Sequence, residues 1–557
     1  MSKSTARPWQ QYARLLRPEA PDLRTIVVYG AASAVLTLAV PLTVDALISN
    51  ITFSTLLAPL VVLVGVLLGC LVLQGVLGAL QAWIAEVIER RIFVRVVGDL
   101  AWRLPRVEIG AFDRAHGPEK VNRFFDTVTV QKSSSKLFLE VTNIVLTTGV
   151  GMTVLAFYHP FLLVFVLALL AAITVLVFVF GLGGVRSAVD ESVAKYEVAA
   201  WLQELARHTT AFCTKGGADF ARRRAERLVG SYVSARKRHF RVLFRQICSA
   251  LGLQVVASTS VLAIGGWLVI DQQLTPGQLV ASELIVTAVV ANITKLGSVL
   301  ESWYDVCAAS DKLGHLFDLP LERQTGAEPE FSGDGVALEL NDVRCALDNG
   351  QDLGDLRDLS LDVKPGERIA LTGPAGGDAS LLLDVLYGLR QPVHGHVTVD
   401  GLDLRQLRLD RTRDEFALVH GTEIVEGTLL DNLKFGRDDV SITEIRDALR
   451  DVGLWDIVLA LPDGLETRIA TGGQPLTPSQ ASQLMLARAI LAEPRLLLLD
   501  GALDRLTPTL RRRVIAHLFD EKHKWTMLVA TNERDVIAAC DRSLDCDTAA
   551  CAVEGDA

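Results

Sequence analysis

The chain has 557 residues, half of them hydrophobic, and a formal net charge of −10. This length exceeds what one hydrophobic core usually serves, so two or more domains are expected, and the negative charge gives no support for binding nucleic acid. The apolar excess lies before residue 300, in runs about as long as the roughly 20 residues that cross a bilayer.

Residues 1–21 are polar and basic, which is typical of a cytosolic leader at the membrane surface. They lack the apolar core of a cleavable signal, so the first span is expected to direct insertion. From residue 22 to residue 317, the pattern predicts a transmembrane domain of six helical spans. The spans are expected at 25–48, 56–84, 137–157, 161–182, 247–270 and 278–299.

Two long connections, near 86–136 and 185–245, are rich in lysine and arginine and have helical periodicity. We therefore expect two cytosolic helical arms. The three short links between spans carry no lysine or arginine. By the positive-inside rule, the leader, the arms and the C-terminal half lie in the cytosol. The sequence thus predicts an integral protein of the plasma (bacterial inner) membrane with both termini in the cytosol.

After the spans, the composition and the secondary-structure pattern of the sequence change. Residues 318–335 are polar and rich in glycine, which is typical of a linker. From 336 to 557, short β-like runs alternate with helical segments, and this alternation predicts an α/β domain.

Residues 373–380 keep the spacing of a phosphate-binding loop but lack its charged residue. Such a loop reads G-x-x-x-x-G-K-[ST] between a strand and a helix. Gly373 and Ser380 stand at its ends, whereas Asp378 replaces the second glycine and Ala379 replaces the lysine. A strand-like run precedes the loop and a helix-like run follows it. From these residues alone, a glycine-rich turn without a ligand remains an alternative.

The order of all these features resembles an ATP-binding cassette (ABC) exporter half-transporter, in which a transmembrane domain is fused to a nucleotide-binding domain. The resemblance covers nearly the whole chain. Residues 274–281 resemble the loop into the last span, residues 428–432 resemble the G-T-I-x-x-N segment, and residues 486–500 resemble the run from the signature helix into the Walker B strand. It implies a P-loop fold of the ABC ATPase type that works as a dimer.

The resemblance also assigns the nucleotide-contacting positions, and many of them are altered. Leu347 falls at the adenine-stacking position and His420 at the Q-loop glutamine. The signature becomes Leu476–Gln480, in which Pro478 replaces a glycine whose backbone would face a phosphate. The cofactor-binding candidates implied by the family are Gly373, Gly376, Gly377, Asp378, Ala379, Ser380, Leu347, His420, Thr477, Ser479 and Gln480.

No catalytic residue is intact at the positions that the resemblance assigns. Gly501 occupies the Walker B glutamate position and Asn532 the switch-histidine position, so no general base is expected. Ser380 and Asp500 keep the hydroxyl and the carboxylate that bind Mg²⁺ in the family. The nucleotide-binding domain is therefore predicted to be degenerate.

Electrostatics indicates what these changes do to binding. Asp378 adds a negative charge beside the phosphates where a lysine charge is lost, and two unit charges ~4 Å apart interact by about 4 kcal/mol at an effective dielectric of 20. ATP and Mg²⁺ are expected to bind weakly or not at all at this chain's own P-loop, and at a composite dimer site if at all. We do not expect ATPase activity from the chain on its own.

Three functional hypotheses follow. The leading one is an exporter subunit that pairs with a catalytically competent ABC half with consensus motifs, in contact with membrane lipid, to move an unidentified substrate. The second is a non-transporting membrane scaffold or regulatory pseudo-transporter. The third is an active ATP-driven exporter with divergent motifs, which is disfavoured because no other G-x-x-x-x-G-K-[ST] occurs in the chain.

Overall fold

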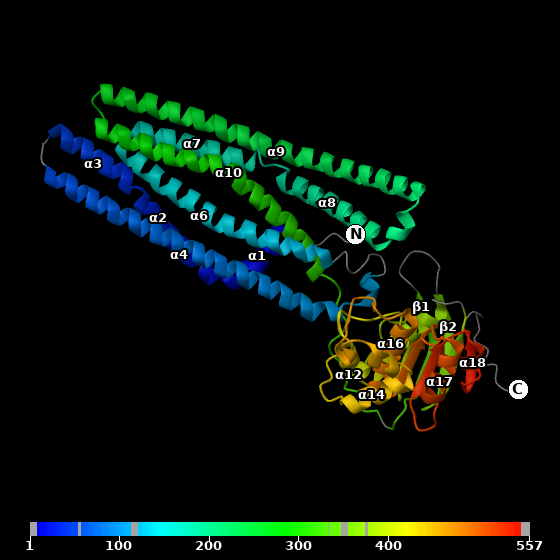
Figure 1. The fold of residues 1–557 in the computed structure, drawn as a ribbon. Helices are drawn as coiled ribbons and strands as arrows, with labels where there is room; N and C mark the ends of the chain where they lie inside the picture. The colour runs from blue at the N-terminus through cyan, green and yellow to red at the C-terminus, as the bar shows by residue number, and fades with distance from the viewer. Residues whose placement is uncertain are drawn as a thin grey trace. The chain divides into compact units, whose positions relative to one another are not determined.

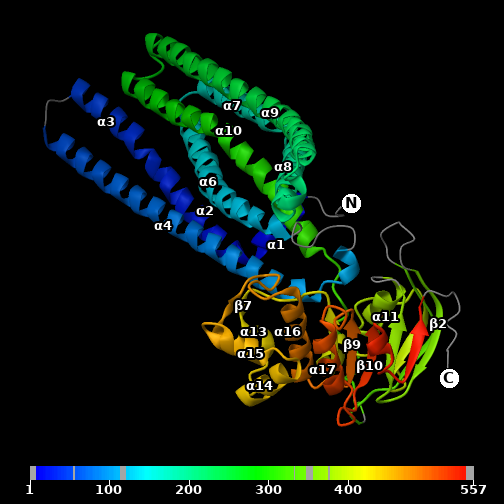
Figure 2. The same cartoon turned by 45° about the vertical axis from the view of Figure 1, so that its right-hand side comes forward.

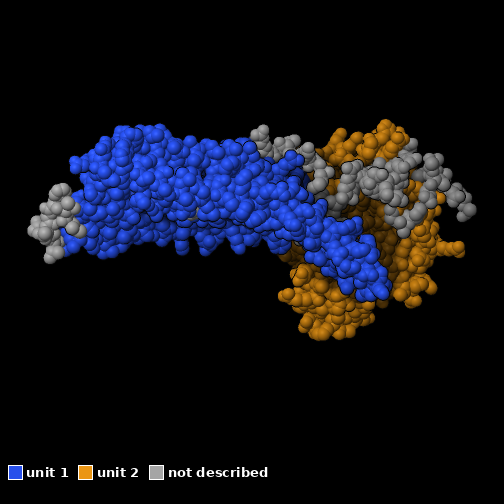
Figure 3. All heavy atoms as spheres, turned by 90° about the horizontal axis from the view of Figure 1, so that it is seen from above, with its two compact units in different colours: residues 1–105, 117–319 blue, residues 106–116, 320–557 orange. Residues whose placement is uncertain are grey.

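The computed structural model describes residues 8–53, 57–112, 121–331, 333–346, 355–373 and 377–546. The chain divides into two compact units, residues 1–105 with 117–319 and residues 106–116 with 320–557, which Figure 3 colours separately. The first unit is helical. The second holds every strand in the described part of the chain.

The first unit is built from long helices joined by short turns (Figure 1). Six helical stretches in the described residues are long and apolar enough to cross a membrane, as the sequence predicts. The described α-helices of this unit are α1 (Pro8–Leu16), α2 (Ala20–Thr37), α3 (Ala39–Phe53), α4 (Leu57–Arg103), α6 (Asp126–Tyr158), α7 (Pro160–Phe178), α8 (Gly184–Arg207), α9 (Lys215–Ile270) and α10 (Pro276–Phe317). Helix α8 lies outside the six apolar stretches.

The helices α4 and α9 extend well past the thickness of a bilayer. They hold 47 and 56 residues, which correspond to about 70 Å and about 84 Å at 1.5 Å per residue, against a hydrocarbon core of ~30 Å. No residue in the apolar stretch of α4 is buried within the protein, as expected of a helix with a lipid-facing surface. The remaining length forms the arms.

The turns that start α9 and α10 are specified by local sequence. The Thr214 hydroxyl accepts a hydrogen bond from the backbone N–H of Gly217 and so caps α9. Thr275 and Gln278 form a capping box at α10, with Pro276 at the first helical position. Helix α10 then packs against α6 and α9 (Figure 2).

A buried polar cluster links the second arm to α10. Lys312 on α10 is 5% exposed. Its Nζ donates to the Ser192 Oγ at 2.6 Å and lies 3.7 Å from the Tyr196 ring centroid, both on α8. The hydroxyl and the ring partly replace the water that a buried ammonium group loses.

The second unit contains a parallel sheet and an antiparallel sheet. The parallel sheet has the order β11 (Arg542–Asp545), β3 (Arg368–Thr372), β10 (Thr526–Ala530), β9 (Leu496–Asp500) and β6 (Phe416–His420). The antiparallel sheet has the order β2 (Asp355–Val363), β1 (Leu338–Ala346), β4 (His394–Val399) and β5 (Leu402–Asp403). A short pair joins β7 (Gly427–Thr428) to β8 (Arg468–Ile469).

Strand β9 shows why the parallel sheet forms the core. Leu496 to Leu499 are each no more than 1% exposed, and a run that is apolar at every position suits a strand covered on both faces. Helix α11 packs on β9 and β10 (Figure 2). The helices of this unit are α11 (Asp378–Leu386), α12 (Leu409–Asp414), α13 (Leu429–Lys434), α14 (Ile442–Asp451), α15 (Trp455–Ala460), α16 (Pro478–Leu491), α17 (Pro508–Leu518) and α18 (Arg534–Ile537).

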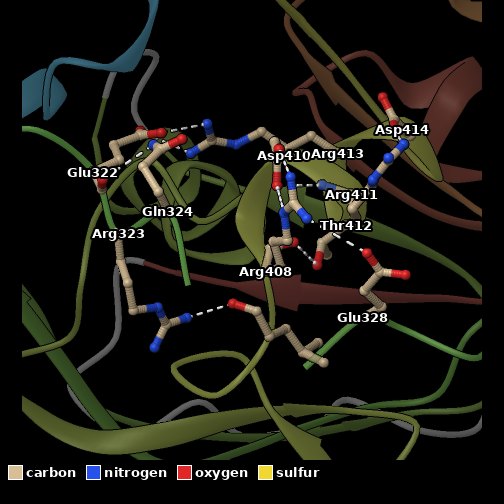
Figure 4. Close-up of polar contacts among 11 residues, drawn as sticks. Glu322, Arg323, Gln324, Glu328, Arg408, Asp410, Arg411, Thr412, Arg413 and Asp414 are labelled. Atoms are coloured by element: carbon tan, nitrogen blue, oxygen red, sulfur yellow. Dashed lines mark hydrogen bonds and ion pairs between the residues drawn. The ribbon is translucent and has the colours of Figure 1, made fainter. Parts of the chain in front are cut away.

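From residue 320 onward, the segment expected as a linker is bonded to the α/β unit (Figure 4). The Arg413 guanidinium donates to both Glu322 carboxylate oxygens, at 2.7 and 2.9 Å. The Ala327 N–H donates to the Gln406 carbonyl at 2.8 Å, and the Arg408 N–H donates to the Ala327 carbonyl at 2.9 Å. We call residues 320–331 the strap. Polar composition alone does not distinguish a strap that is bonded to the α/β unit from a free linker.

Candidate functional site

Four strands of the parallel sheet end at the same edge and place the candidate residues there. His420 at the end of β6 is in register with Asp500 at the end of β9. Asp500 is in register with Ala530 at the end of β10, and Gly373 directly follows β3. The carboxyl edge of an open α/β sheet is where such folds bind ligands.

Both carboxylate oxygens of Asp500 are bonded by side chains of this chain. The Ser380 hydroxyl donates to Oδ1 at 2.9 Å, and the His420 Nδ1 lies 2.7 Å from Oδ2. The Asp500 side chain is 15% exposed and the His420 side chain 52%. The structure therefore brings three of the predicted site residues together, from α11, β6 and β9.

The pKa shifts in this group favour an ion pair. The hydrogen bond to Asp500 raises the pKa of His420 above its ordinary value, against the opposing effect of burial. For Asp500, burial favours protonation, but the hydrogen bonds from His420 and Ser380 outweigh it and lower its pKa. Both shifts favour a protonated imidazole beside an ionised carboxylate.

Asn532 at the switch position binds the start of the loop. Its Oδ1 accepts from the Gly373 N–H at 3.3 Å, and its Nδ2 donates to the Gly373 carbonyl at 2.7 Å. Gly373 has a φ of +149°, a value that glycine adopts readily. The amide therefore uses both backbone polar groups of Gly373.

Beyond Gly373, the start of α11 occupies the second half of the predicted loop. Gly377 precedes the helix, Asp378 lies in its first turn, and Ala379 is only 6% exposed. A carboxylate in a first turn interacts favourably with the helix dipole, but it also repels a phosphate at the same place. Gly376 and Leu347 lie outside the described residues.

The signature residues form the N-terminal cap of α16. The Thr477 Oγ1 accepts from the Gln480 N–H at 3.3 Å, and the Gln480 Oε1 accepts from the Thr477 N–H at 2.8 Å. Pro478 takes the first helical position, where no N–H is required, and Ser479 follows it, partly buried. The altered signature is therefore well suited to start a helix.

Gly501 follows Asp500 with a φ of +59° and donates its N–H to the Ala530 carbonyl at 3.1 Å. Among the described residues other than Gly501 and its two chain neighbours, no atom lies within 4 Å of the place where a Cβ would stand. The position has room for a side chain but a backbone conformation that L-residues rarely adopt. It supplies no carboxylate.

Two arginines near the site were not identified from the sequence. Arg505 donates to the Gly421 carbonyl at 2.8 Å and so connects the segments that follow β9 and β6. Arg511, 7% exposed, donates to Glu533 at 2.8 Å and to Asp535 at 3.0 Å. These pairs join segments that are distant in the sequence, so no spacing pattern could have indicated them.

The residues present do not fit an ordinary Mg²⁺–nucleotide site. A hydroxyl and a carboxylate are the protein ligands that magnesium takes beside nucleotide phosphates, but His420 holds one oxygen of that carboxylate. Position 379 has no charge, and Asp378 adds a negative one. Across the described part of the chain, no group of three His, Cys, Asp or Glu residues could hold a metal ion.

Comparison with known families explains the arrangement. Residues 23–206 match the family described as "ABC transporter transmembrane region", and residues 356–504 match the family described as "ABC transporter". The chain belongs to the ABC transporters. It is a half-transporter and an integral membrane protein, with one transmembrane domain fused to one domain of the type that binds ATP in this family.

Relatives and a solved structure give the same assignment. The half-transporter is 31% identical over 270 residues to an ATP-dependent lipid A-core flippase of Thiobacillus denitrificans, covering 48% of this chain and 46% of the flippase. It is 27% identical over 291 residues to a multidrug efflux ATP-binding/permease protein of Mycobacterium tuberculosis, covering 52% of this chain and 24% of that protein. The chain spans about half the length, or less, of the curated relatives it matches.

The structural neighbour covers much more of the chain. A bacterial Atm1-family ABC exporter with ATP bound has a TM-score of 0.80 and 19% identity, and the match covers 96% of this chain and 94% of the exporter. The predicted fold class is thereby confirmed: a six-span helical membrane domain with long helical extensions, followed by an α/β domain of the ABC ATPase type.

Proposed function

We propose that this half-transporter is the degenerate subunit of an ABC exporter whose ATP is hydrolysed with the catalytic groups of a partner half. The observation that carries the proposal is the bonding of Asp500. Its carboxylate oxygens are held by Ser380 and His420, while the positions of the lysine and of the general base hold Ala379 and Gly501.

The preserved core supports a structural role for the domain. Leu382, Leu498 and Leu528 belong to one buried apolar cluster, which also includes Ala379, so the domain keeps a packed core although the nucleotide-contacting positions are altered. The side-chain bonds of His420 and Asn532 link the strand ends without a nucleotide. A domain of this kind can bind a partner domain and transmit the partner's conformational changes without hydrolysing ATP at its own P-loop.

Dimer composition follows from the same residues. A homodimer would contain two sites, each combining this P-loop with this signature, and both halves of each site would be altered. In a heterodimer, one site combines the partner's P-loop and general base with Thr477 and Gln480 of this chain. That composite site is the one at which we propose that ATP and Mg²⁺ bind.

Two of the relatives are named as an ATP-dependent lipid A-core flippase and a multidrug efflux ATP-binding/permease protein. For this chain we propose an amphipathic substrate, carried across the plasma (bacterial inner) membrane, with both termini in the cytosol. The basic leader and basic arms support this orientation.

The test is ATP turnover by the purified full-length chain, alone and with any ABC half that co-purifies. We expect turnover alone to stay near background and the pair to hydrolyse ATP. Loss of the partner's general base should abolish that activity, whereas Asp500→Asn in this chain should change it little. Ordinary exporter turnover by the chain alone would refute the proposal, and an inactive chain that captures no ABC half would favour a scaffold instead.

A further inference from the structure

Helix α9 has an exposed face that is apolar within the fifth span and basic just before it. Figure 1 shows α9 along one edge of the helical unit. Leu243, Gln246 and Ala250 are buried against that unit. On the outward side, exposed apolar side chains recur at helical spacing at Phe244, Leu251, Val255 and Leu262. This outward side suits contact with the acyl chains of lipid.

Three arginines follow the same helix outside the span. Arg238, Arg241 and Arg245 are exposed, and their spacing of three and four residues places them on one side of α9. We call these three residues the basic face. Arg245 donates from Nε to the Phe180 carbonyl at 3.2 Å and also from Nη2, which leaves its Nη1 for another acceptor. Arg238 and Arg241 form no hydrogen bond or ion pair with the residues that the structure describes.

The charge of the basic face is not neutralised by acids on its own helix. From residue 227 to residue 270, the chain contains no Asp or Glu. On the neighbouring helices, Glu191 of α8 and Glu301 of α10 pair with Arg236 instead, at 3.1 and 3.9 Å. Within the described part of the chain, no acid is paired with the basic face, which therefore keeps its positive charge.

The basic face begins at the level of the lipid headgroups. The fifth span is expected to start at Ile247, and Arg245 and Arg241 precede it by two and six residues, or about 3 and 9 Å. The headgroup layer adds roughly 5–8 Å to each side of the hydrocarbon core. Arg245 thus lies within this layer and Arg241 at its edge. Arg238, about 14 Å from the span, is still within a Debye length of ~8 Å from that edge.

We propose that the basic face of α9 binds the headgroups of anionic phospholipids. Arg241 and Arg245 donate to phosphate oxygens, and the exposed Phe244 packs against the glycerol backbone. The outward apolar side chains of the span contact the acyl chains. Clusters of basic residues next to a span attract anionic lipids by this chemistry. The site is separate from nucleotide binding and does not depend on the proposed partner half.

The experiment uses the purified full-length chain in detergent, with any partner that co-purifies. Native mass spectrometry measures its affinity for dioleoyl phosphatidylglycerol, with dioleoyl phosphatidylcholine as the zwitterionic arm. Glycerol phosphate and inorganic phosphate serve as competitors, because a soluble phosphate shares the headgroup chemistry. We expect phosphatidylglycerol to bind preferentially, and neither soluble phosphate to displace it.

The matched variants are Arg241→Gln and Arg223→Gln, which remove the same charge from exposed positions of α9. Arg223 is 24 residues before Ile247, or about 36 Å along the helix, and so lies far outside the headgroup layer. Arg241→Gln should weaken phosphatidylglycerol binding about fivefold, whereas Arg223→Gln should change it less than about twofold. Because Arg241 has no partner among the described residues, its replacement should leave the fold intact.

The variant Arg241→Lys keeps the charge and should bind phosphatidylglycerol within about twofold of the natural chain. Equal binding of the two lipids, or displacement by inorganic phosphate, would overturn the lipid assignment. Equal effects of Arg241→Gln and Arg223→Gln would also overturn it, and this is the result expected if a partner half covers the basic face.

Discussion

The His420 Nδ1 lies 2.7 Å from the Asp500 Oδ2, across the edge of the parallel sheet. In an ABC transporter this carboxylate would face magnesium, whereas here an imidazole from the neighbouring strand is bonded to it. Because the Ser380 hydroxyl takes the other carboxylate oxygen, the altered site is closed by bonds within the chain. This relationship leads to the first prediction.

Replacing His420 with alanine should destabilise the α/β domain by about 1 kcal/mol, since Asp500 would lose a hydrogen-bond partner. The matched control is His394→Ala, which breaks a histidine–aspartate pair at 3.1 Å whose side chains are 64% and 59% exposed. Surface pairs of that kind contribute little. Urea unfolding of the full-length chain measures both variants, and equal losses would contradict the structural role of the His420–Asp500 pair.

The variant Gly501→Glu restores the glutamate that acts as the general base in the family, but it does not restore the residues that bind the nucleotide. We expect no ATP turnover by the chain alone, because Ala379 and Asp378 still disfavour the nucleotide. We also expect a loss of about 1–2 kcal/mol, because a non-glycine residue at a φ of +59° is strained.

The control for this variant is Gly501→Ala, which imposes the same backbone strain without a carboxylate. Phosphate release and urea unfolding are measured on both. If Gly501→Glu hydrolysed ATP by itself, the site would be one substitution from activity, and its description as degenerate would be wrong.

The sequence predicts the role position of His420 but not its hydrogen bond. Counting from the G-T-I-x-x-N segment places His420 at the Q-loop position, and the resemblance to an ABC exporter implies the order of the strands. Its bond to Asp500 could not be predicted, because it depends on which strands are neighbours: β6 and β9 are 80 residues apart at this pair but in register in the sheet.

The docking of the segment from residue 320 to residue 331 could not be predicted from the sequence, for a different reason. Its glycines and charges predicted a linker, and its composition contains no sign that Arg413 would bind Glu322. Continuous apolar runs indicate burial in lipid or in a core, so they predict the six spans and the leucines of β9. Docking by arginine pairs leaves no such signal in the sequence.

The strap formed by this segment gives the third prediction. Arg413→Gln should cost about 2 kcal/mol, because it breaks a two-point bond to Glu322 between side chains that are 18% and 11% exposed. It should also increase proteolytic cleavage within 320–331. Arg411→Gln on the same helix breaks only a 3.5 Å pair with 56% and 66% exposed side chains, so it should do neither. Equal cleavage in the two variants would show that the strap is held by other contacts.

His523 gives a prediction about pH. Its ring stacks on Trp525 at 4.2 Å and lies 4.9 Å from the ring of His517, which pairs with Asp451 at 3.3 Å. Burial, then the charges of His517 and Lys522, lower the pKa of His523, and the charges of Asp520 and Asp451 oppose this only in part. Its Nε2 has no hydrogen bond to the described residues, which suits the neutral form.

The sign follows from linkage. Below the unfolded-state pKa of about 6.5, the unfolded chain binds a proton at this position more readily than the folded chain does. His523 therefore lowers the free energy of unfolding as the pH falls through that value. Urea unfolding of the full-length chain at about pH 7.5 and about pH 5.5 should show a smaller loss of stability in His523→Gln than in the natural chain. The exposed His394→Gln serves as the control and should keep the natural pH dependence more closely than His523→Gln does. If His523→Gln loses as much stability on acidification as the natural chain, the imidazole at 523 is not a source of this pH dependence.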